Sequence, residues 1–375
     1  MAKGTIVYMG IFELPDKNAA AHRVVNNGKI FTALGYRTVF LGAVRGEHFT
    51  GIRKSSYDDN VYEESYPVGV KDWLSRMVDT KNIEAVAEKY PDTLLIITYN
   101  VPLITYKAIK KVFAKKGIKV AYDCTEWNDY TVGSFPKRLY KKHDEKLIRT
   151  KLHKYCDDII VISRMMEKQY QGKNLLILPP LVDVEDPIWH QKKIEHDGVF
   201  EFCFAGTVGV KDRVDIIVNA FRELDRQDVR LKVIGITEEE YRQLYGSDSE
   251  QIDKDERIQF MGRVSHKESI KFVLSCDCYI FIREKTRQNQ AGFPTKYAEA
   301  CTCGVPIIAT DVSDIKEFQN EFHIIIDDVD MESIKKAMNR ILENCLDSKR
   351  EYSNNNLFDY HHYIGETEEW ISKIR

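Results

Sequence analysis

The sequence of 375 residues lacks several features that mark particular classes of protein. It contains no run of about 18 uncharged apolar residues, so it predicts no membrane-spanning helix, and its first residues lack the long apolar stretch of a signal peptide. The formal net charge is only -3, so no overall electrostatic field favours nucleic acid. These absences predict a globular cytoplasmic protein without a nucleic-acid partner.

The eight cysteines are not spaced as in a structural zinc site. They stand singly or as the Cys-x-Cys pairs Cys276/Cys278 and Cys301/Cys303, whereas most structural zinc sites use Cys-x2-Cys pairs. We therefore expect reduced thiols and no bound metal. The loop after the first predicted strand also lacks Gly-x-Gly-x-x-Gly, which argues against a nicotinamide or flavin cofactor.

The length of the chain and its 43% hydrophobic residues are sufficient for two ordinary globular cores. Strand-like and helix-like patterns alternate in each half, which predicts two α/β domains with parallel sheets covered by helices. The expected strands are residues 5–9, 38–42, 93–98, 119–123 and 158–163 in the first half, and 200–206, 230–235, 257–262 and 278–282 in the second. The main expected helices are residues 18–34, 104–116, 136–155 and 214–224, and a Ser265–Glu268 capping box begins another.

The division of the chain follows from composition. Residues 177–198 contain three prolines and several acidic residues without a sustained period, which indicates a connection between domains. We predict a first domain of residues 1–185, a second domain of residues 186–350, and a helical tail of residues 351–375 that packs on one of them. Ligands of such sheets bind at the carboxyl ends of the strands.

In the first domain, two loops are candidates. Asn18 can cap a helix whose first turn contains Ala19 and Ala20, which leaves backbone N–H groups open to an anion or a sugar hydroxyl, although the alanines could simply favour the helix. His22 lies slightly deeper. The stretch YDCTEWND (122–129) places acidic residues after a buried strand, and they could orient hydroxyls, accept a proton or only cap a turn. The predicted acceptor-side residues are Asn18, Ala19, Ala20, His22, Asp123 and Glu126, with Asp129 a further acid of the same stretch.

In the second domain, the stretch AGTVGVKD (205–212) has two glycines ahead of Lys211, a pattern that can bind phosphate but is also ordinary in α/β folds. Farther along, Pro294 and Gly304 delimit a helix of about ten residues. Lys296 lies in its first turn, where the helix dipole disfavours a cation unless an anion is bound. The alternative is a surface ion pair between Lys296 and Glu299 worth ~0.2–0.5 kcal/mol.

These stretches resemble the family 4 type retaining glycosyltransferases, which have the two-domain GT-B fold. The resemblance rests on GFPTKYAEACTCGVPIIATD, FMGRVSHKESIKFVLSCDCYIFI and FAGTVGVKD, and it covers most of residues 200–311. The first half agrees more loosely, through NAAAHRVVNNGKIFTALGY, YDCTEW and DIIVIS. The resemblance implies two Rossmann-like domains that face each other across a cleft.

The resemblance also implies roles for residues. Glu299 would bind the ribose of a nucleoside-diphosphate sugar, Lys211 and residues 206–209 would meet the diphosphate, and residues 262–264 would line the base. The implied donor-binding residues are Gly206, Thr207, Gly209, Lys211, Gly262, Arg263, Val264, Arg283, Gly292, Phe293, Pro294, Thr295, Lys296 and Glu299. The implied catalytic residues are Glu126, Lys211 and Lys296.

Two positions depart from the family pattern. The usual motif has two glutamates separated by seven residues, but Ala291 stands where the first would be, and a subset of the family carries the Pro-Thr-Lys version present at residues 294–296. Many relatives carry an arginine where this chain has Thr207. Lys296 or Arg283 could supply that positive charge.

The implied reaction is transfer of a sugar from a nucleoside diphosphate, UDP before GDP, with retention at the anomeric carbon. The implied acceptor is a saccharide, lipid-linked if the basic helix within residues 137–155 touches the cell membrane; the alternative is that this helix packs on the sheet. Two other functions remain open, a nucleotide-sugar epimerase of the same fold and a non-catalytic nucleotide-sugar-binding partner. The nucleotide sugar is a substrate, and the implied reaction requires no cofactor and no metal.

Overall fold

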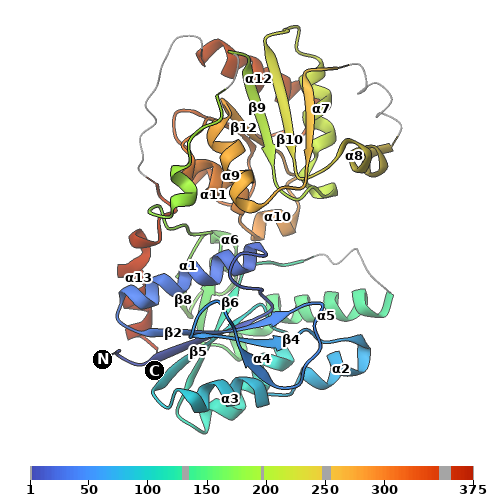
Figure 1. Ribbon diagram of the computed structural model, residues 1–375. Helices are drawn as coiled ribbons and strands as arrows, with labels where there is room; N and C mark the ends of the chain where they lie inside the picture. The colour runs from blue at the N-terminus through green and yellow to red at the C-terminus, as the bar shows by residue number, and fades with distance from the viewer. Residues whose placement is uncertain (1, 129–134, 196–197, 247–254, 346–355, 375) are drawn as a thin grey trace. The chain divides into compact units, whose positions relative to one another are not determined.

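The computed structural model describes residues 2–128, 135–195, 198–246, 255–345 and 356–374. It divides into two compact units, each built on a largely parallel sheet (Figure 1). The first unit comprises Met1–Leu181, Ala291–Phe293 and Asp359–Arg375, and the second comprises Val182–Gln290 and Pro294–Phe358. Asp129 of the acidic stretch and residues 351–355 of the predicted tail lie outside the described residues.

The described part of the first unit contains an eight-stranded sheet in the order β3-β4-β2-β1-β5-β6-β7-β8, in which β3 alone runs antiparallel to its neighbour. Its strands are β1 (Thr5–Gly10), β2 (Arg37–Val44), β3 (Ile52–Lys54), β4 (Val61–Ser65), β5 (Thr93–Tyr99), β6 (Lys119–Cys124), β7 (Asp158–Val161) and β8 (Asn174–Ile177). Its helices are α1 (Ala19–Ala33), α2 (Gly69–Arg76), α3 (Lys81–Lys89), α4 (Leu103–Ala114), α5 (Phe135–Lys151), α6 (Arg164–Gln169) and α13 (Ile364–Ser372), with 3-10 turns η1 (Leu152–Lys154) and η6 (Tyr360–Tyr363).

Apolar side chains on both faces of this sheet hold its helices. Figure 1 shows α1 on one face and α3 and α4 on the other. Tyr8 and Ile97 point into the core beneath α1, which also includes Trp370 of α13. Trp370 is 2% exposed, and its indole N–H donates to the carbonyl oxygen of Asn174 at 3.1 Å. The end of the chain therefore completes the first unit.

The second unit contains a six-stranded parallel sheet in the order β11-β10-β9-β12-β13-β14. Its strands are β9 (Phe200–Ala205), β10 (Val229–Ile234), β11 (Ile258–Gly262), β12 (Cys278–Phe281), β13 (Ile307–Thr310) and β14 (His323–Ile326). The helices of this region are α7 (Val214–Arg222), α8 (Glu238–Tyr245), α9 (His266–Ser275), α10 (Arg287–Ala291), α11 (Thr295–Thr302) and α12 (Met331–Cys345), with 3-10 turns η2 (Pro187–His190), η3 (Val210–Asp212) and η5 (Ile315–Phe318). Helices α7 and α12 pack together against one face, and α9 and α11 lie beside β9 and β12.

The alternation predicted from the sequence is present in both units, with small shifts at the ends of the elements. The structure divides the chain at Leu181, four residues before the predicted boundary, and the described end of the predicted tail lies in the first unit. The elements from β3 to α3 were not predicted. None of the helices in the described ranges is long and apolar enough to cross a membrane.

Candidate functional site

The loop after β9 is shaped by two glycines that allow a very close approach. Gly206 has φ +135°, and a Cβ atom there would lie 2.2 Å from Cε of Lys296. Gly235, at the end of β10, has φ +110°, and a Cβ atom there would lie 2.1 Å from the carbonyl oxygen of Gly206. Gly235 requires glycine because a side chain there would collide with the backbone of Gly206, and Gly206 requires it because its positive φ strains other residues. The predicted Gly206–Gly209 loop is in this way held directly against α11.

Lys296 reaches this loop from the first turn of α11. Its Nζ lies 3.2 Å from the carbonyl oxygen of Thr207 and 3.2 Å from Oδ1 of Asp212. The same atom lies 4.5 Å from the centre of the Phe204 ring, at a distance typical of a cation–π contact. Burial lowers the pKa of Lys296 to about 8, although Asp212 opposes that shift. The prediction that the lysine and the glycine loop lie together is consistent with this geometry.

Asp212 is the centre of the charge network. It is 1% exposed, and its Oδ1 accepts from Lys296 and from Nη2 of Arg283 at 2.9 Å. Its Oδ2 accepts from the backbone N–H of Gly209 at 3.1 Å, which fixes the loop. Burial alone would raise the pKa of Asp212, but Lys296 and Arg283 hold the pKa below its ordinary value. One buried carboxylate therefore positions two cations.

Further charges surround this group. Arg213 has a left-handed backbone conformation with φ 41° and binds Asp215 and Glu284. Lys211, predicted as a phosphate ligand, is exposed at the loop surface and lowers the pKa of both Asp212 and Lys296. Lys211, Lys296 and Arg283 thus balance Asp212 with positive charge to spare, which favours an anion at this loop.

Glu299 lies one turn farther along α11 and has a different partner. Its Oε1 lies 3.0 Å from Nε2 of His266, the first residue of α9. Since Lys296 binds Asp212 and Glu299 binds His266, the alternative of a Lys296–Glu299 ion pair is not the arrangement seen. About four-fifths of the Glu299 side chain is buried, because its exposed fraction is 21%. The remaining exposed part is available to a ligand hydroxyl.

Other predicted donor residues of the second unit lie at the start of α11 and at the end of β11. Pro294 is the N-cap of α11, so Thr295 rather than Pro294 is the first helical residue, and Gly304 follows the helix with φ 68°. Gly262 has φ 65° and precedes Val264, which is half-buried, whereas Arg263 is 77% exposed and lies 3.5 Å from Glu240.

Ala291, Gly292 and Phe293 belong to the first unit. Ala291 is fully buried, and its carbonyl oxygen accepts from Oγ of Ser163 at 2.6 Å. A glutamate at this position would have no room without displacement of its neighbours. Gly292 and Phe293, which were predicted as donor contacts, thus belong to a different unit from Lys296 and Glu299.

In the first unit, the α1 loop is as predicted. Asn18 is the N-cap of α1, and its Oδ1 accepts from the backbone N–H of Ala21 at 2.8 Å. Ala19 is exposed, whereas Ala20 and His22 are half-buried. Glu126 follows β6 as an exposed carboxylate, 3.2 Å from Nδ2 of Asn128. These residues remain candidates for a ligand that reaches the end of the sheet.

The prediction for Asp123 does not fit the structure. Asp123 is 0% exposed, and Arg23 binds both of its oxygens, with Nη2 at 2.8 Å and Nε at 3.0 Å. The hydroxyl of Tyr8 donates to the same carboxylate. Asp123 is therefore a structural residue that anchors α1 to β6, and the carboxylate has no face open to an acceptor.

Three residues of the networks were missed from the sequence. Asp212 and His266 lie within the motifs but had no predicted role, because their partners Arg283, Lys296 and Glu299 are 33 to 84 residues away. Arg23 was not among the predicted site residues, because its partner Asp123 lies 100 residues away. No group of three or more His, Cys, Asp or Glu residues arranged to hold a metal ion occurs in the part of the chain that the structure describes.

Comparison with known proteins gives the fold. Residues 185–357 match the family model described as glycosyl transferases group 1. A search of the curated proteins finds no match. Sucrose-phosphate synthase from Thermosynechococcus elongatus is similar over 99% of both chains, with a TM-score of 0.70 at 13% identity.

Two other solved structures are similar over the same length. The Anabaena protein HepE, solved with UDP and glucose, has a TM-score of 0.69 at 12% identity and covers 98% of this chain and 99% of its own. The lipopolysaccharide outer core galactosyltransferase WaaB has a TM-score of 0.64 at 14% identity, with the same coverage. The chain therefore has the GT-B fold of two Rossmann-like domains, and its residues 185–357 match the glycosyl transferases group 1 family.

Proposed function

We propose that this protein is a retaining glycosyltransferase that moves a sugar from a nucleoside-diphosphate sugar to a saccharide acceptor. The observation that carries the proposal is the convergence of Lys296 and Arg283 on Asp212, beside the glycine loop after β9. This group lies within the residues that match the glycosyl transferases group 1 family. A diphosphate is the ligand that best fits surplus cations beside a glycine loop.

The chemistry that this loop offers is stabilisation of a leaving group. When the bond from the anomeric carbon to the diphosphate breaks, negative charge develops on the diphosphate oxygens. Lys296 and Arg283 are cations fixed in advance by Asp212, and Lys211 adds positive charge at the loop surface, which lowers the barrier without rearrangement of the two fixed cations at the moment of reaction. The pair of carboxylates used by glycoside hydrolases is not needed for this step.

We further propose that Glu299 binds the ribose hydroxyls and that His266 positions its carboxylate. His266 at the start of α9 lies 3.0 Å from the Glu299 side chain in α11, and this contact restricts the rotamer of Glu299. The loop formed by residues 262–264 precedes His266 directly, so it is suitable to line the base. UDP is the expected nucleotide, with GDP second; HepE, a structural neighbour, was solved with UDP and glucose.

A thermal-shift panel of UDP, GDP, ADP, CMP and dTDP tests the donor site, because a ligand of the native state raises the unfolding midpoint. We expect the largest shift with UDP, and a loss of that shift in Lys296→Ala. Stabilisation by NAD alone, or by none of the nucleotides, would contradict the proposal. The matched control is Lys285→Ala, which removes an exposed lysine of the same unit that pairs with Asp311 and Asp327.

Two assays separate transfer from the alternatives. Incubation of a UDP-sugar without acceptor should give no epimer, and formation of an epimer would identify an epimerase instead. Because Ala291 replaces the first glutamate of the motif, a non-catalytic binding partner is the second candidate function; it predicts UDP binding that Glu299→Ala weakens, without turnover on any acceptor. Retention is tested by the anomeric proton signal of the product.

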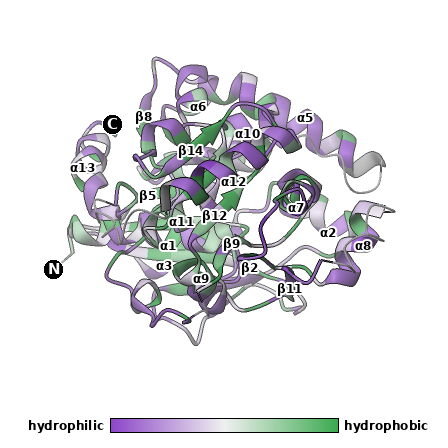
Figure 2. Cartoon of the chain, turned by 90° about the horizontal axis from the view of Figure 1, so that it is seen from above, coloured by the Kyte–Doolittle hydropathy of each residue, from purple (hydrophilic) through white to green (hydrophobic). Residues whose placement is uncertain are grey.

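We propose a lipid-linked acceptor on the basis of α5. Of its predicted apolar side, Leu152 is buried and Leu147 and Ile148 are half-buried, so most of that side packs inward as in the alternative interpretation. The outward face is nevertheless basic with one apolar residue, and Figure 2 draws α5 as mainly hydrophilic. Its exposed residues at helical spacing are Leu139, Lys142, His143 and Lys146.

Helix α2 adds apolar surface to this basic face. The ring of Trp73 in α2 packs edge-on against that of Tyr140 in α5, with centroids 4.5 Å apart, and Val70 and Leu74 are 73% and 53% exposed. Cations beside apolar side chains suit a surface of anionic lipid. We expect the protein to sediment with phosphatidylglycerol vesicles and not with phosphatidylcholine vesicles, and salt should release it. Equal binding to both, or to neither, would contradict membrane contact. WaaB, another neighbour, is named as a lipopolysaccharide outer core galactosyltransferase.

A further inference from the structure

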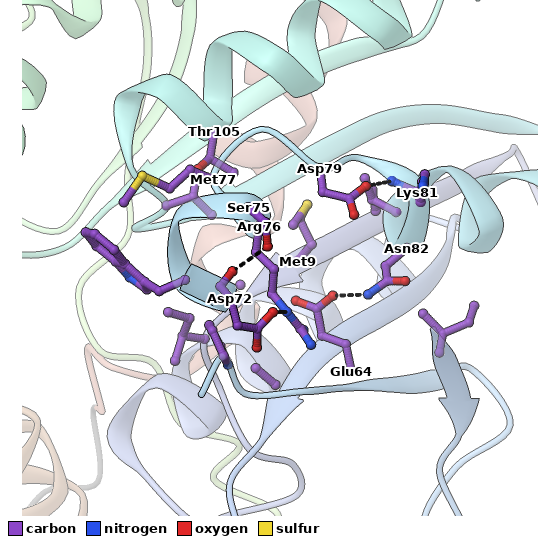
Figure 3. Close-up of a pocket in the computed structure, with 18 of the residues that line it drawn as sticks. Met9, Glu64, Asp72, Ser75, Arg76, Met77, Asp79, Lys81, Asn82 and Thr105 are labelled. Atoms are coloured by element: carbon purple, nitrogen blue, oxygen red, sulfur yellow. Dashed lines mark hydrogen bonds and ion pairs between the residues drawn. The ribbon is translucent and has the colours of Figure 1, made fainter. Parts of the chain in front are cut away.

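A cavity of 590 Å³ in the first unit lies at the carboxyl ends of three strands (Figure 3). Met9 and Gly10 end β1, Ala43 is near the end of β2, and Glu64 is near the end of β4. Helix α2 and the first turn of α3 form the other side. None of the predicted acceptor residues lines this cavity, so it is a site separate from that set.

One wall of the cavity is apolar and is built from several elements. A ligand with a flat or flexible apolar body could fill it, since methionine and tryptophan side chains adapt to such surfaces. The residues of this wall are Met9, Ile52, Trp73, Met77, Ile83 and Val101. Trp73 is held by its contact with Tyr140, and Met77 is 7% exposed, so this part of the wall is preformed.

The other wall carries polar side chains that are already paired. Asn82 Nδ2 donates to Oε2 of Glu64 at 2.6 Å, and Nε of Arg76 donates to Oδ1 of Asp72 at 3.0 Å, as Figure 3 shows. Arg76 also donates to the carbonyl oxygen of Ser65 at 2.5 Å. These contacts fix the polar groups and leave the second oxygen of Glu64 and the amide oxygen of Asn82 as acceptors for ligand hydroxyls.

The charges of this wall favour an uncharged ligand. Arg76 is balanced by Asp72, and burial raises the pKa of Glu64. An anionic group placed here would face Glu64, Asp72 and Asp79. A cationic group would face Arg76 and Lys81, which also line the cavity. Hydroxyl groups bind to such a wall without either cost.

We propose that this cavity binds an uncharged amphiphile, a sugar or polyol group that carries an alkyl or aryl substituent. The hydroxyls lie on Glu64 and Asn82, and the substituent lies against Trp73 and Met77. The identification of this amphiphile as part of the acceptor rests on the proposed function. Its binding to the cavity does not depend on that function.

The probe is octyl β-glucoside below its micelle-forming concentration, titrated calorimetrically into the full chain without nucleotide. We expect saturable binding with one site per chain, and glucose and octanoate should each bind about tenfold more weakly or less, which corresponds to at least ~1.4 kcal/mol. Equal affinity for glucose would show that the apolar wall is not used, and equal affinity for octanoate would show that an uncharged ligand is not preferred. Either result would overturn the proposal.

Two pairs of variants locate the binding. Thr105→Phe places a ring in the cavity, whereas Ile104→Phe changes its neighbour, which is 47% exposed and does not line the cavity. Trp73→Ala removes part of the apolar wall, whereas Lys71→Ala changes an exposed residue of the same helix that does not line the cavity. The first variant of each pair should lower the affinity by about tenfold, and the second should leave it unchanged. Unchanged affinity in Thr105→Phe, with circular dichroism and unfolding midpoint as in the parent, contradicts the site.

The UDP thermal shift is measured on the same samples. If UDP stabilises the protein and octyl glucoside does not bind, only the cavity proposal fails. If octyl glucoside binds as expected and no nucleotide does, the proposed glycosyltransferase function fails and the cavity remains.

Discussion

Asp212 has an unusual position among the residues of the loop, because it is an acid at a site expected to bind an anion. Its carboxylate holds Lys296 and Arg283 at 3.2 and 2.9 Å. A bound diphosphate would share these two cations with Asp212. The single carboxylate therefore positions both cations but neutralises only part of their charge. In this arrangement, the positive charge is positioned before the ligand arrives.

The protonation of Lys296 predicts a pH dependence of UDP affinity. Its pKa is about 8 in the free protein, and UDP favours the cation, so affinity should be full well below pH 8 and fall as the pH rises through 8. Lys296→Arg keeps its charge at high pH and should remove this fall. Affinity is measured by calorimetry from about pH 6.5 to about pH 9.5, a range centred on the pKa of about 8 and below the ordinary lysine pKa of about 10.4. A fall of the same size in Lys296→Arg would contradict the role of this proton.

The pairing of His266 with Glu299 predicts a positioning effect. His266→Ala frees the Glu299 carboxylate to adopt other rotamers, and we expect UDP to bind about threefold to tenfold more weakly, because one fixed hydrogen-bonding group loses its orientation. Fold and unfolding midpoint should change little. His361→Ala is the matched control, since His361 is also paired with a carboxylate, Asp359 at 2.8 Å, but lies in the first unit. An equal loss in both variants would exclude a positioning role.

At the scale of elements, a buried ion pair joins α1 to β6. Arg23 binds Asp123 with two nitrogens, and its Nη1 donates to the carbonyl oxygen of Leu178 at 2.8 Å, so the helix, the strand and the chain beyond β8 share one guanidinium. Asn27 in the next turn of α1 donates to the hydroxyl of Tyr8 at 3.1 Å. The network fixes the register of α1 on the sheet.

Removal of one partner of this network should be costly. Asp123→Ala leaves Arg23 buried without its counter-ion, and we expect the free energy of unfolding of the first unit to fall by about 3–5 kcal/mol in urea denaturation. Lys373→Ala, which breaks an exposed pair with Glu369 in α13, should change it by less than ~0.5 kcal/mol. A loss below ~1 kcal/mol in Asp123→Ala would mean that Asp123 is not structural.

Local signals explain which elements the sequence predicted. Asn18 and the Ser265–Glu268 capping box marked the starts of α1 and α9, and both caps are present. A continuous apolar run predicted β5, and an apolar run interrupted only by Glu201 predicted β9, because strands buried on both faces have such sequences. The segment from β3 to α3 was missed, since β3 has three residues and α2 buries none of its side chains. Short strands and helices that bury no side chains do not produce a clear periodic pattern of apolar residues in the sequence.

The candidate site, like the fold, was predicted only where its residues leave a local signal in the sequence. Lys296 and the glycine loop were found because their local backbone requirements are visible in sequence, through Gly206 and Gly304. Asp212 and His266 act through contacts between distant segments, which no local pattern carries. The burial of Asp123 depends on Arg23, 100 residues earlier, and its predicted role was wrong for that reason.

At the scale of the whole molecule, the two units are distinct bodies of one chain, and the last segment, Asp359–Arg375, belongs to the first. This predicts that damage to α13 acts on one unit alone. Trp370→Ala should lower the free energy of unfolding of the first unit by about 3–5 kcal/mol, because the buried indole leaves a cavity. The UDP shift of the second unit should persist. Calorimetric scans with and without UDP measure both.

The control for this variant is Glu368→Ala, which changes an exposed residue of the same helix. Loss of the UDP shift in Trp370→Ala, with the second unit still folded by its own thermal transition, would contradict the independence of the units.

The return of α13 to the first unit also has a consequence for biosynthesis. A ribosome releases the eight strands of that unit first, but Trp370 emerges only after the whole second unit has been translated. Until then, the surface of the first sheet that Trp370 covers is open to water and to other chains. The newly made first unit is therefore expected to depend on chaperones for as long as translation of the second unit lasts.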